Sequence, residues 1–220
     1  TGDKIVHSKN GLLSTVAWQI GDKIDYALEG SIFVSGSLMK WLRDQMQLFE
    51  NTKETQAMAE SVENTNGVYI VPAFVGLGAP YWDDACQASI LGLTFGANKN
   101  HIVRAALESM AYQSKDVLDA MKQDSQINIS SLKVDGGAAA NDFLLQFQSD
   151  LLQMPVQRFK TNELTALGAA YLAGLSCGYW TLDELGVDLQ KEFVPEKSQE
   201  DMDSLYSNWK KAVKTCQSYK

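Results

Sequence analysis

The sequence predicts an α/β fold in which helices cover both faces of a mixed sheet. Predicted strands and helices alternate along most of the 220 residues, which is the pattern of such folds. The continuous apolar run at 68–71 is typical of a buried strand. An apolar segment at 127–134 runs into Asp135-Gly136-Gly137 and then into a helical pattern. This crossing is the feature that carries most of the functional argument.

Composition limits the classes of protein to which the chain can belong. Hydrophobic residues make up 45% of it and aromatic residues 10%, so we expect one large domain or two small ones with a sizeable core. A net charge of −8 argues against nucleic-acid partners and anionic membranes. We find no apolar run long enough to span a bilayer and no signal peptide. Three cysteines far apart in sequence predict reduced thiols in a cytoplasmic protein.

The first elements are a hairpin and a helix. Residues 12–20 and 24–28 predict two strands joined by a turn at 21–23. Ser31 is the predicted cap of a helix reaching to about residue 48, whose buried stripe comprises Val34, Leu38, Trp41 and Leu42. Gly36 interrupts this helix among small residues. Either close helix packing or close approach of a ligand would account for it.

The middle of the chain predicts a polar helix at 52–62, a strand at 68–71 and a strand at 88–95. The intervening loop, 72–83, is rich in glycine, proline and aromatic residues, which indicates either a functional loop or a cover over the edge of the core. Asn100 is the predicted cap of a long helix at 101–121. Within that helix, His101 is expected to be structural, and Arg104 and Glu108 are expected to form a solvated i, i+4 ion pair.

The last third alternates strands and helices. Strands are predicted at 132–134 and 155–159, and helices at 142–152, 163–174 and 198–218. The helix at 163–174 is rich in alanine and glycine, so we expect it to press closely on a neighbour; Gly168, Ala169, Ala173 and Gly174 are the small residues concerned. Thr181 and Glu184 have the spacing of a capping box.

The turn at Gly136 and Gly137 predicts a nucleotide site. Two glycines bring bare backbone close to a ligand, and the following helix offers N–H groups and a positive dipole end to an anion. Alanines 138–140 leave a surface flat enough for a ring. A strand–glycine–glycine–helix turn with no ligand remains the alternative from local residues alone.

Several motifs are absent. The chain has no Gly-x-Gly-x-x-Gly turn after a strand, no Gly-x-x-x-x-Gly-Lys-Ser/Thr loop, no Gly-x-Ser-x-Gly elbow and no Cys-x-x-Cys. Its acidic residues are scattered, and two histidines exclude a histidine-rich metal cluster. We therefore assign no catalytic residue and no metal ligand to this chain.

Three groups of motifs resemble the C-terminal half of the FGGY carbohydrate kinases over effectively the whole chain. They lie at 134–150 with 163–174, at 88–93 with 101–108, and at 64–74 with 76–83. The last two groups favour the members of the family that phosphorylate glycerol.

The resemblance implies an actin-like ATPase architecture, with residues 1–220 forming a C-terminal nucleotide-binding domain of ribonuclease-H-like topology. Its first strands are expected upstream of Thr1. ATP and Mg²⁺ are the implied cofactors. The family pattern implies nucleotide contacts at Gly36, Gly137 and Asn141, with Gly136 giving backbone access. Lys40 stands where the family commonly has glutamine, and it could meet a phosphate or reach solvent.

The implied reaction transfers the γ-phosphoryl group of ATP to glycerol and yields glycerol 3-phosphate. The family's catalytic aspartate, glycerol-binding residues and acidic metal site are expected upstream of Thr1, so this chain alone is predicted to be inactive. We expect the protein to form a homo-oligomer. Two alternatives stay open: a non-catalytic nucleotide-binding module, and a related kinase acting on xylulose or gluconate.

Overall fold

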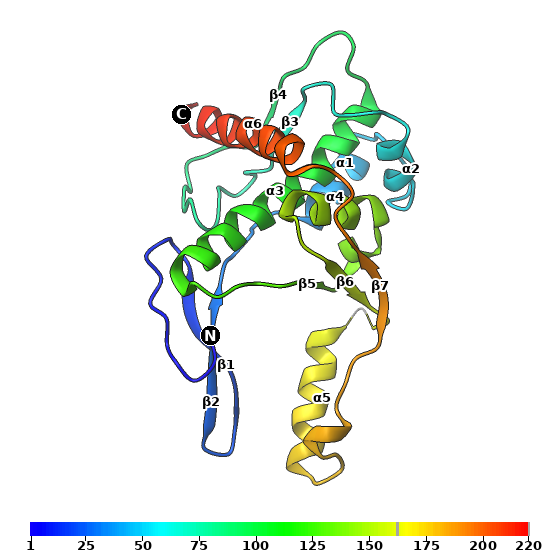
Figure 1. Ribbon diagram of the computed structural model, residues 1–220. Coiled ribbons are helices and arrows are strands. Elements are labelled where there is room, and N and C mark those ends of the chain that lie inside the picture. The colour runs from blue at the N-terminus through cyan, green and yellow to red at the C-terminus, as the bar shows by residue number, and fades with distance from the viewer. Residues whose placement is uncertain (162, 220) are drawn as a thin grey trace.

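The computed structural model describes residues 1–161 and 163–219. Its strands form three small sheets, namely β1-β2, β3-β4 and β5-β6-β7, and helices lie against the second and third of them (Figure 1). The third sheet is mixed, because β5 pairs parallel with β6 while β7 pairs antiparallel with it. The α/β class and a mixed sheet are confirmed, although the described strands are divided among three sheets.

The predicted hairpin is confirmed. Strands β1 (Leu13–Ile20) and β2 (Lys23–Glu29) pair antiparallel. Ile20 faces Lys23, which leaves a two-residue turn. Gly21 opens that turn with a φ of +58°, a conformation that glycine adopts without steric cost. The hairpin extends away from the body of the molecule (Figure 1).

Helix α1 (Gly36–Asp44) is shorter than the sequence predicted, and Ser31 does not cap it. The carbonyl of Ser31 instead accepts a hydrogen bond of 2.9 Å from the N–H of Ala79. The segment before the helix is thereby attached to the 72–83 loop and stays outside the helix. Ser35 occupies the N-cap position, so Gly36 begins the helix and does not interrupt it.

Helix α3 (Lys99–Ser125) forms the centre of the core. Its cap is Asn98 and not Asn100: the Asn98 side chain accepts from the N–H of Asn100, and the N–H of Asn98 donates to Nδ1 of His101. The sequence prediction missed the cap by two residues because the helix starts earlier than its apolar stripe. The structural role expected for His101 is confirmed, since its ring completes a capping box.

The ion pair of α3 is not solvated, which corrects the sequence prediction. Arg104 Nε and Glu108 Oε1 are 2.9 Å apart, and the Glu108 side chain is only 4% exposed. Arg104 also donates through Nη1 to the carbonyls of Ala59 and Val62, because helix α2 (Glu54–Glu60) and the turn after it cover this part of α3. Burial raises the pKa of Glu108, and the hydrogen bond from Arg104 opposes that shift.

The remaining core elements follow the predicted order. Strands β3 (Tyr69–Val71) and β4 (Ser89–Leu91) pair antiparallel. The predicted strand at 88–95 is therefore too long, and its Leu93 and Phe95 are exposed. Helix α4 (Asp142–Leu152) has the predicted bounds. It stands between β5 (Leu132–Val134) and β6 (Val156–Phe159) in the chain, and places Leu144, Leu145, Phe147 and Leu151 in the core.

The C-terminal helix α6 (Gln199–Ser218) is confirmed, with its cap at Ser198. It is attached to α3 through Asp116, which accepts hydrogen bonds from Tyr206 Oη at 2.6 Å and Trp209 Nε1 at 2.8 Å. The Trp209 ring also stacks on Tyr112, with centroids 5.3 Å apart. The edge strand β7 (Leu189–Phe193) precedes α6 and was not predicted.

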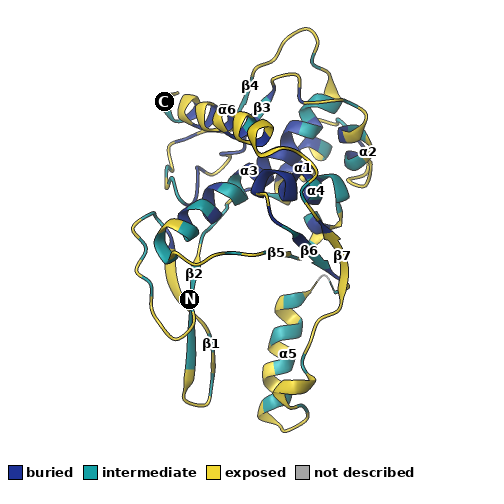
Figure 2. Ribbon diagram, in the orientation of Figure 1, coloured by how far each residue is buried: buried dark blue, intermediate teal, exposed yellow. Residues whose placement is uncertain are grey.

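Helix α5 (Leu164–Ser176) contains no buried residue and stands apart from the core (Figures 1 and 2). The expectation that its small residues press on a neighbouring element is wrong for Gly168, around which there is open space. Gly174 is the exception, since a Cβ there would lie 2.0 Å from the Trp180 ring. The capping box of Thr181 and Glu184 is confirmed at the short helix η2 (Leu182–Glu184).

Candidate functional site

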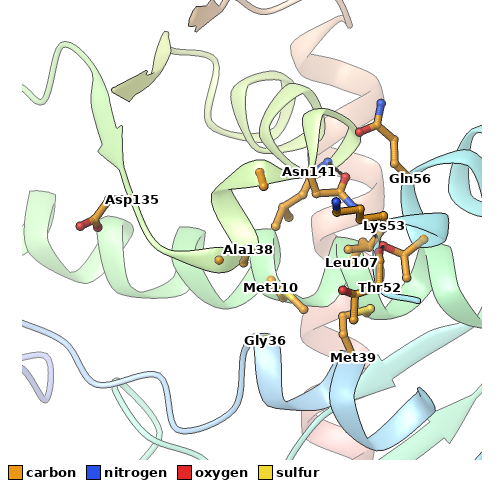
Figure 3. Close-up of a pocket in the computed structure, with 14 residues that line it drawn as sticks. Gly36, Met39, Thr52, Lys53, Gln56, Leu107, Met110, Asp135, Ala138 and Asn141 are labelled. Carbon is orange, nitrogen blue, oxygen red and sulfur yellow. Dashed lines mark hydrogen bonds between the residues drawn. The ribbon is translucent and has the colours of Figure 1, made fainter. Parts of the chain in front are cut away.

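A pocket of about 750 Å³ lies where α1, α2, α3 and the turn before α4 meet (Figure 3). Side chains of α1, α3 and α4 form its apolar part: Met39, Leu107, Met110 and Leu144. Its polar part comes from α2, the residues before it and the 135–141 turn: Thr52, Lys53, Thr55, Gln56, Asp135 and Asn141. A cavity of this size with an apolar wall and a few polar groups is suited to a small organic ligand.

The glycine turn after β5 forms one wall of the pocket. Gly136 has a φ of +83°, which requires glycine or a strained residue. Residues Gly137–Ala140 make one turn of 3-10 helix, η1. Asn141 then caps α4, because its Oδ1 accepts from the N–H of Leu144 at 3.0 Å. The strand–turn–helix order predicted from the sequence is confirmed.

The start of α4 differs from the expectation in one respect. The sequence suggested that its first N–H groups would be available to an anion. In the structure the N–H of Asp142 donates to Gln56 Oε1 at 3.1 Å, and that of Leu144 donates to Asn141. Protein acceptors therefore take these two donors, and the helix end offers an anion less than its dipole alone would suggest.

Two hydrogen bonds attach α2 to the beginning of α4. One is the contact between Gln56 and the Asp142 N–H. The other runs from Asn141 Nδ2 to Thr55 Oγ1 at 3.1 Å. The Thr55 hydroxyl donates its own proton to the carbonyl of Thr52 at 2.7 Å. The pocket wall is thus a network that fixes the Asn141 side chain from two sides.

Gly36 and Gly137 line the same pocket from different elements, and each is open where a side chain would stand. A Cβ at either position would meet no atom within 4 Å, and neither residue has a positive φ. The fold of the described residues therefore does not require glycine at these two positions. Their lack of a side chain matters if the pocket holds a ligand.

The structure separates the two lysines near this region. Lys40, a predicted nucleotide-site residue, is exposed and is not among the described residues that line the pocket. Lys53 lines it and stands at the N-cap position of α2. Sequence reasoning missed Lys53, because it belongs to no motif and its position depends on how α2 packs against α4.

Two carboxylates lie near the pocket. Asp135 lines it and accepts a hydrogen bond of 3.2 Å from the N–H of Leu164. Asp142 accepts from Lys191 Nζ at 2.6 Å and Arg158 Nη1 at 2.7 Å. Burial alone would raise the pKa of Asp142, but the hydrogen bonds from Lys191 and Arg158 outweigh it and lower that pKa. The described residues contain no group of three His, Cys, Asp or Glu that could hold a metal.

The 72–83 loop contributes nothing to this pocket among the described residues. Trp82 Nε1 donates to the carbonyl of Gly11 at 2.6 Å, and the Trp82 ring meets Phe33 edge-on with centroids 6.0 Å apart. Trp82 itself is exposed, but Ala73 and Leu77 of the loop are buried in the core and Tyr81 packs against it. Of the two interpretations open from the sequence, packing over the edge of the core agrees with these contacts.

In the described part of the chain, none of the helices combines the length and the hydropathy that a membrane span requires.

Comparison with known proteins identifies the class. Residues 1–177 match the FGGY family of carbohydrate kinases, C-terminal domain, and the chain belongs to that family. The resemblance inferred from the three motif groups is confirmed.

The most informative relatives are glycerol kinases. The chain is 55% identical over 223 residues to the glycerol kinase of Bacillus velezensis and 52% identical over 223 residues to that of Thermus thermophilus, and both alignments cover 100% of it. It spans 45% of the length of each of these curated relatives.

Solved structures show the same fold. The crystal structure of Plasmodium falciparum glycerol kinase with ADP superposes with a TM-score of 0.90 at 38% identity, covering 98% of this chain and 44% of that one. The gluconate kinase of Lactobacillus acidophilus superposes with a TM-score of 0.84 at 21% identity over 99% of this chain and 45% of that one, which shows the fold alone.

Proposed function

We propose that residues 1–220 are the C-terminal nucleotide-binding domain of a glycerol kinase, with the ribonuclease-H-like topology of actin-like ATPases. The intact enzyme transfers the γ-phosphoryl group of ATP to a hydroxyl of glycerol and forms glycerol 3-phosphate. The glycerol kinases that are more than half identical to this chain support glycerol as the acceptor. The crystal structure of the Plasmodium enzyme with ADP supports ATP as the donor.

One observation carries the nucleotide assignment. Gly36 and Gly137 come from segments about a hundred residues apart in sequence, yet both line one pocket and leave open space in front of their backbone. A ring that lies between the 137–140 backbone and the apolar side chains of α1 and α3 would use that space. The pocket volume of about 750 Å³ lies within the range of small-molecule sites.

In this proposal the residues of this chain bind and orient the nucleotide. The backbone at Gly136 and Gly137 permits close approach, the Asn141 amide offers a hydrogen bond, and the apolar side chains exclude water from one face of the base. When bound with the nucleotide, Mg²⁺ neutralises phosphate charge, and it commonly relies on phosphate oxygens and one or two carboxylates. The base that accepts the glycerol proton is expected outside this chain.

Alanine at the two open glycines tests the assignment. In the intact protein, Gly137→Ala and Gly36→Ala should each raise the KM for ATP by at least about fivefold, because a new methyl group enters space meant for the ligand. The melting temperature should stay close to that of the wild type, since neither Cβ meets a protein atom. Gly186→Ala, another open glycine that does not line the pocket, is the matched control. Unchanged KM values in both pocket variants would contradict the assignment.

Acceptor and enzyme class are tested separately. ATP consumption by the intact protein should be strong with glycerol and weak with xylulose or gluconate, and the 220-residue chain alone should show no glycerol-dependent turnover. ATP binding without turnover on any of the three acceptors would favour the non-catalytic module. Preference for a sugar would keep the fold and change the substrate.

A further inference from the structure

We infer that Thr55 is a positioning residue for nucleotide binding, acting through the side chain of Asn141. This inference rests on the proposed function, because it concerns the same pocket. Thr55 is 2% exposed and belongs to α2, an element that the glycine-turn motif does not include. No sequence motif indicated it.

The Thr55 hydroxyl has both of its roles assigned. It donates to the carbonyl of Thr52 at 2.7 Å and accepts from Asn141 Nδ2 at 3.1 Å. Since a hydroxyl carries a single proton and that proton is directed to Thr52, the oxygen faces Asn141 as an acceptor only. The partner atom on Asn141 must therefore be the amide nitrogen.

The other end of the Asn141 amide is constrained in the same sense. Its Oδ1 accepts from the N–H of Leu144 at 3.0 Å, which requires the amide oxygen on that side. A flipped amide would place a donor against the Leu144 N–H and lose both contacts. Thr55 and Leu144 thus select one of the two amide orientations.

The selected orientation determines what Asn141 can offer a ligand. A primary amide has two N–H donors and one carbonyl with two lone pairs. One N–H is used by Thr55, so the second stays available on a residue that lines the pocket. An N–H at this position suits an acceptor atom of the nucleotide, such as a ring nitrogen, a ribose oxygen or a phosphate oxygen. Thr55 itself has no remaining donor for the ligand.

The test is a double-mutant cycle in the intact protein, with the Kd of ATP measured by titration calorimetry. Thr55→Val keeps the shape and removes the hydroxyl, and should raise the Kd about three- to tenfold. Asn141→Ala should raise it at least as much. In the Asn141→Ala background, Thr55→Val should add little, because the two residues act as one unit.

A second pair of variants guards against a folding defect in Thr55→Val. Thr55→Ser and Thr55→Ala both lack the methyl group and differ only in the hydroxyl. The Thr55→Ser variant should bind ATP nearly as tightly as the wild type, whereas the Thr55→Ala variant should bind it more weakly. Thr215→Val is the matched control, since the Thr215 hydroxyl donates to the carbonyl of Lys211 on α6 at 2.9 Å and Thr215 does not line the pocket.

The outcomes separate this inference from the proposed function. If wild-type protein fails to bind ATP, the proposed function itself is wrong. If ATP binds and Asn141→Ala weakens it while Thr55→Ala binds as well as Thr55→Ser, the positioning role is overturned and the pocket assignment stands. Equal losses from Thr55→Val in both backgrounds would likewise overturn it, because Thr55 would then act independently of Asn141.

Discussion

Asp116 is a carboxylate on α3 that is 5% exposed and has no cationic partner among its hydrogen bonds. Burial raises its pKa from the ordinary 3.8, although donors on Tyr206 and Trp209 pull in the opposite direction. Burial also raises the pKa of Tyr206 and of Tyr81, so both phenols stay protonated. The side chain links α3 to α6, and its burial favours the protonated form of the carboxyl.

This arrangement predicts a pH-dependent stability. A carboxyl whose pKa is higher in the folded than in the unfolded state keeps its proton up to a higher pH in the folded state. The folded state therefore binds more protons just above pH 3.8, and stability falls as pH rises through that window towards the folded pKa.

Asp116→Asn removes the titrating carboxyl and replaces it with an amide of nearly the same shape. Urea unfolding between about pH 3 and pH 7 should show the free energy of unfolding of the variant gaining on that of the wild type as pH rises. Two curves that stay parallel over this range would contradict a raised pKa.

Gly92 and Gly168 are a contrasting pair of glycines. Gly92 has a φ of +79°, and a Cβ there would lie 2.0 Å from the carbonyl oxygen of Gly67. Gly168 lies inside helix α5 with open space around it.

We expect Gly92→Ala to destabilise the protein by about 2 kcal/mol or more, through backbone strain and a backbone clash. Gly168→Ala should stabilise α5 by up to about 1 kcal/mol, because alanine is the better helix former. Thermal unfolding followed by circular dichroism measures both. A neutral Gly92→Ala would show that the β4 end and the 67 turn can separate at little cost.

At the level of elements, sequence prediction succeeded where local signals agree with one another. Helix α4 has an N-cap at Asn141 and a regular apolar stripe, and its bounds were predicted correctly. The hairpin was predictable because its strands flank a glycine turn. Strand β7 was missed because four of its five residues are exposed. Its pairing with β6 is a long-range event that no local pattern reports.

In the candidate site, too, some residues were predictable from the sequence and others were not. Gly36, Gly137 and Asn141 came from motif resemblance, and the structure places all three around one pocket. Thr55, Gln56 and Lys53 reach that pocket only because α2 packs beside α4. This packing depends on contacts between residues almost ninety positions apart. Helix α2 and the turn after it also cover α3 and thereby bury the Arg104–Glu108 pair, whose i, i+4 spacing says nothing of burial.

Helix α5 is the α-helix with the least tertiary support among the described residues. None of its residues is buried, and its outside contacts include the hydrogen bonds from Leu164 to Asp135 and from Tyr171 Oη to the carbonyl of Gly186. We expect its amides to exchange with solvent much faster than those of α3 in the 220-residue chain, because local opening costs little where few groups are packed. Hydrogen exchange with mass spectrometry measures this. Equal protection of α5 and α3 would contradict the expectation.

In the whole molecule, packing is uneven. The core lies among α3, α4, α6 and β3, while the hairpin and α5 extend away from it and are only partly covered (Figure 2). Leu13 and Val16 of the hairpin and Leu172 of α5 are exposed apolar residues. These side chains contribute little to the core, so the hairpin and α5 depend mainly on their own hydrogen bonds.

The three cysteines occupy very different surroundings. Sγ of Cys86 and Sγ of Cys216 lie 2.9 Å apart in the interior, whereas Cys177 at the end of α5 is exposed. A maleimide dye applied to the native protein will consequently attach almost entirely at residue 177. That single label lies at the end of the least supported α-helix, so its fluorescence anisotropy and emission maximum would change if another protein segment packed against α5.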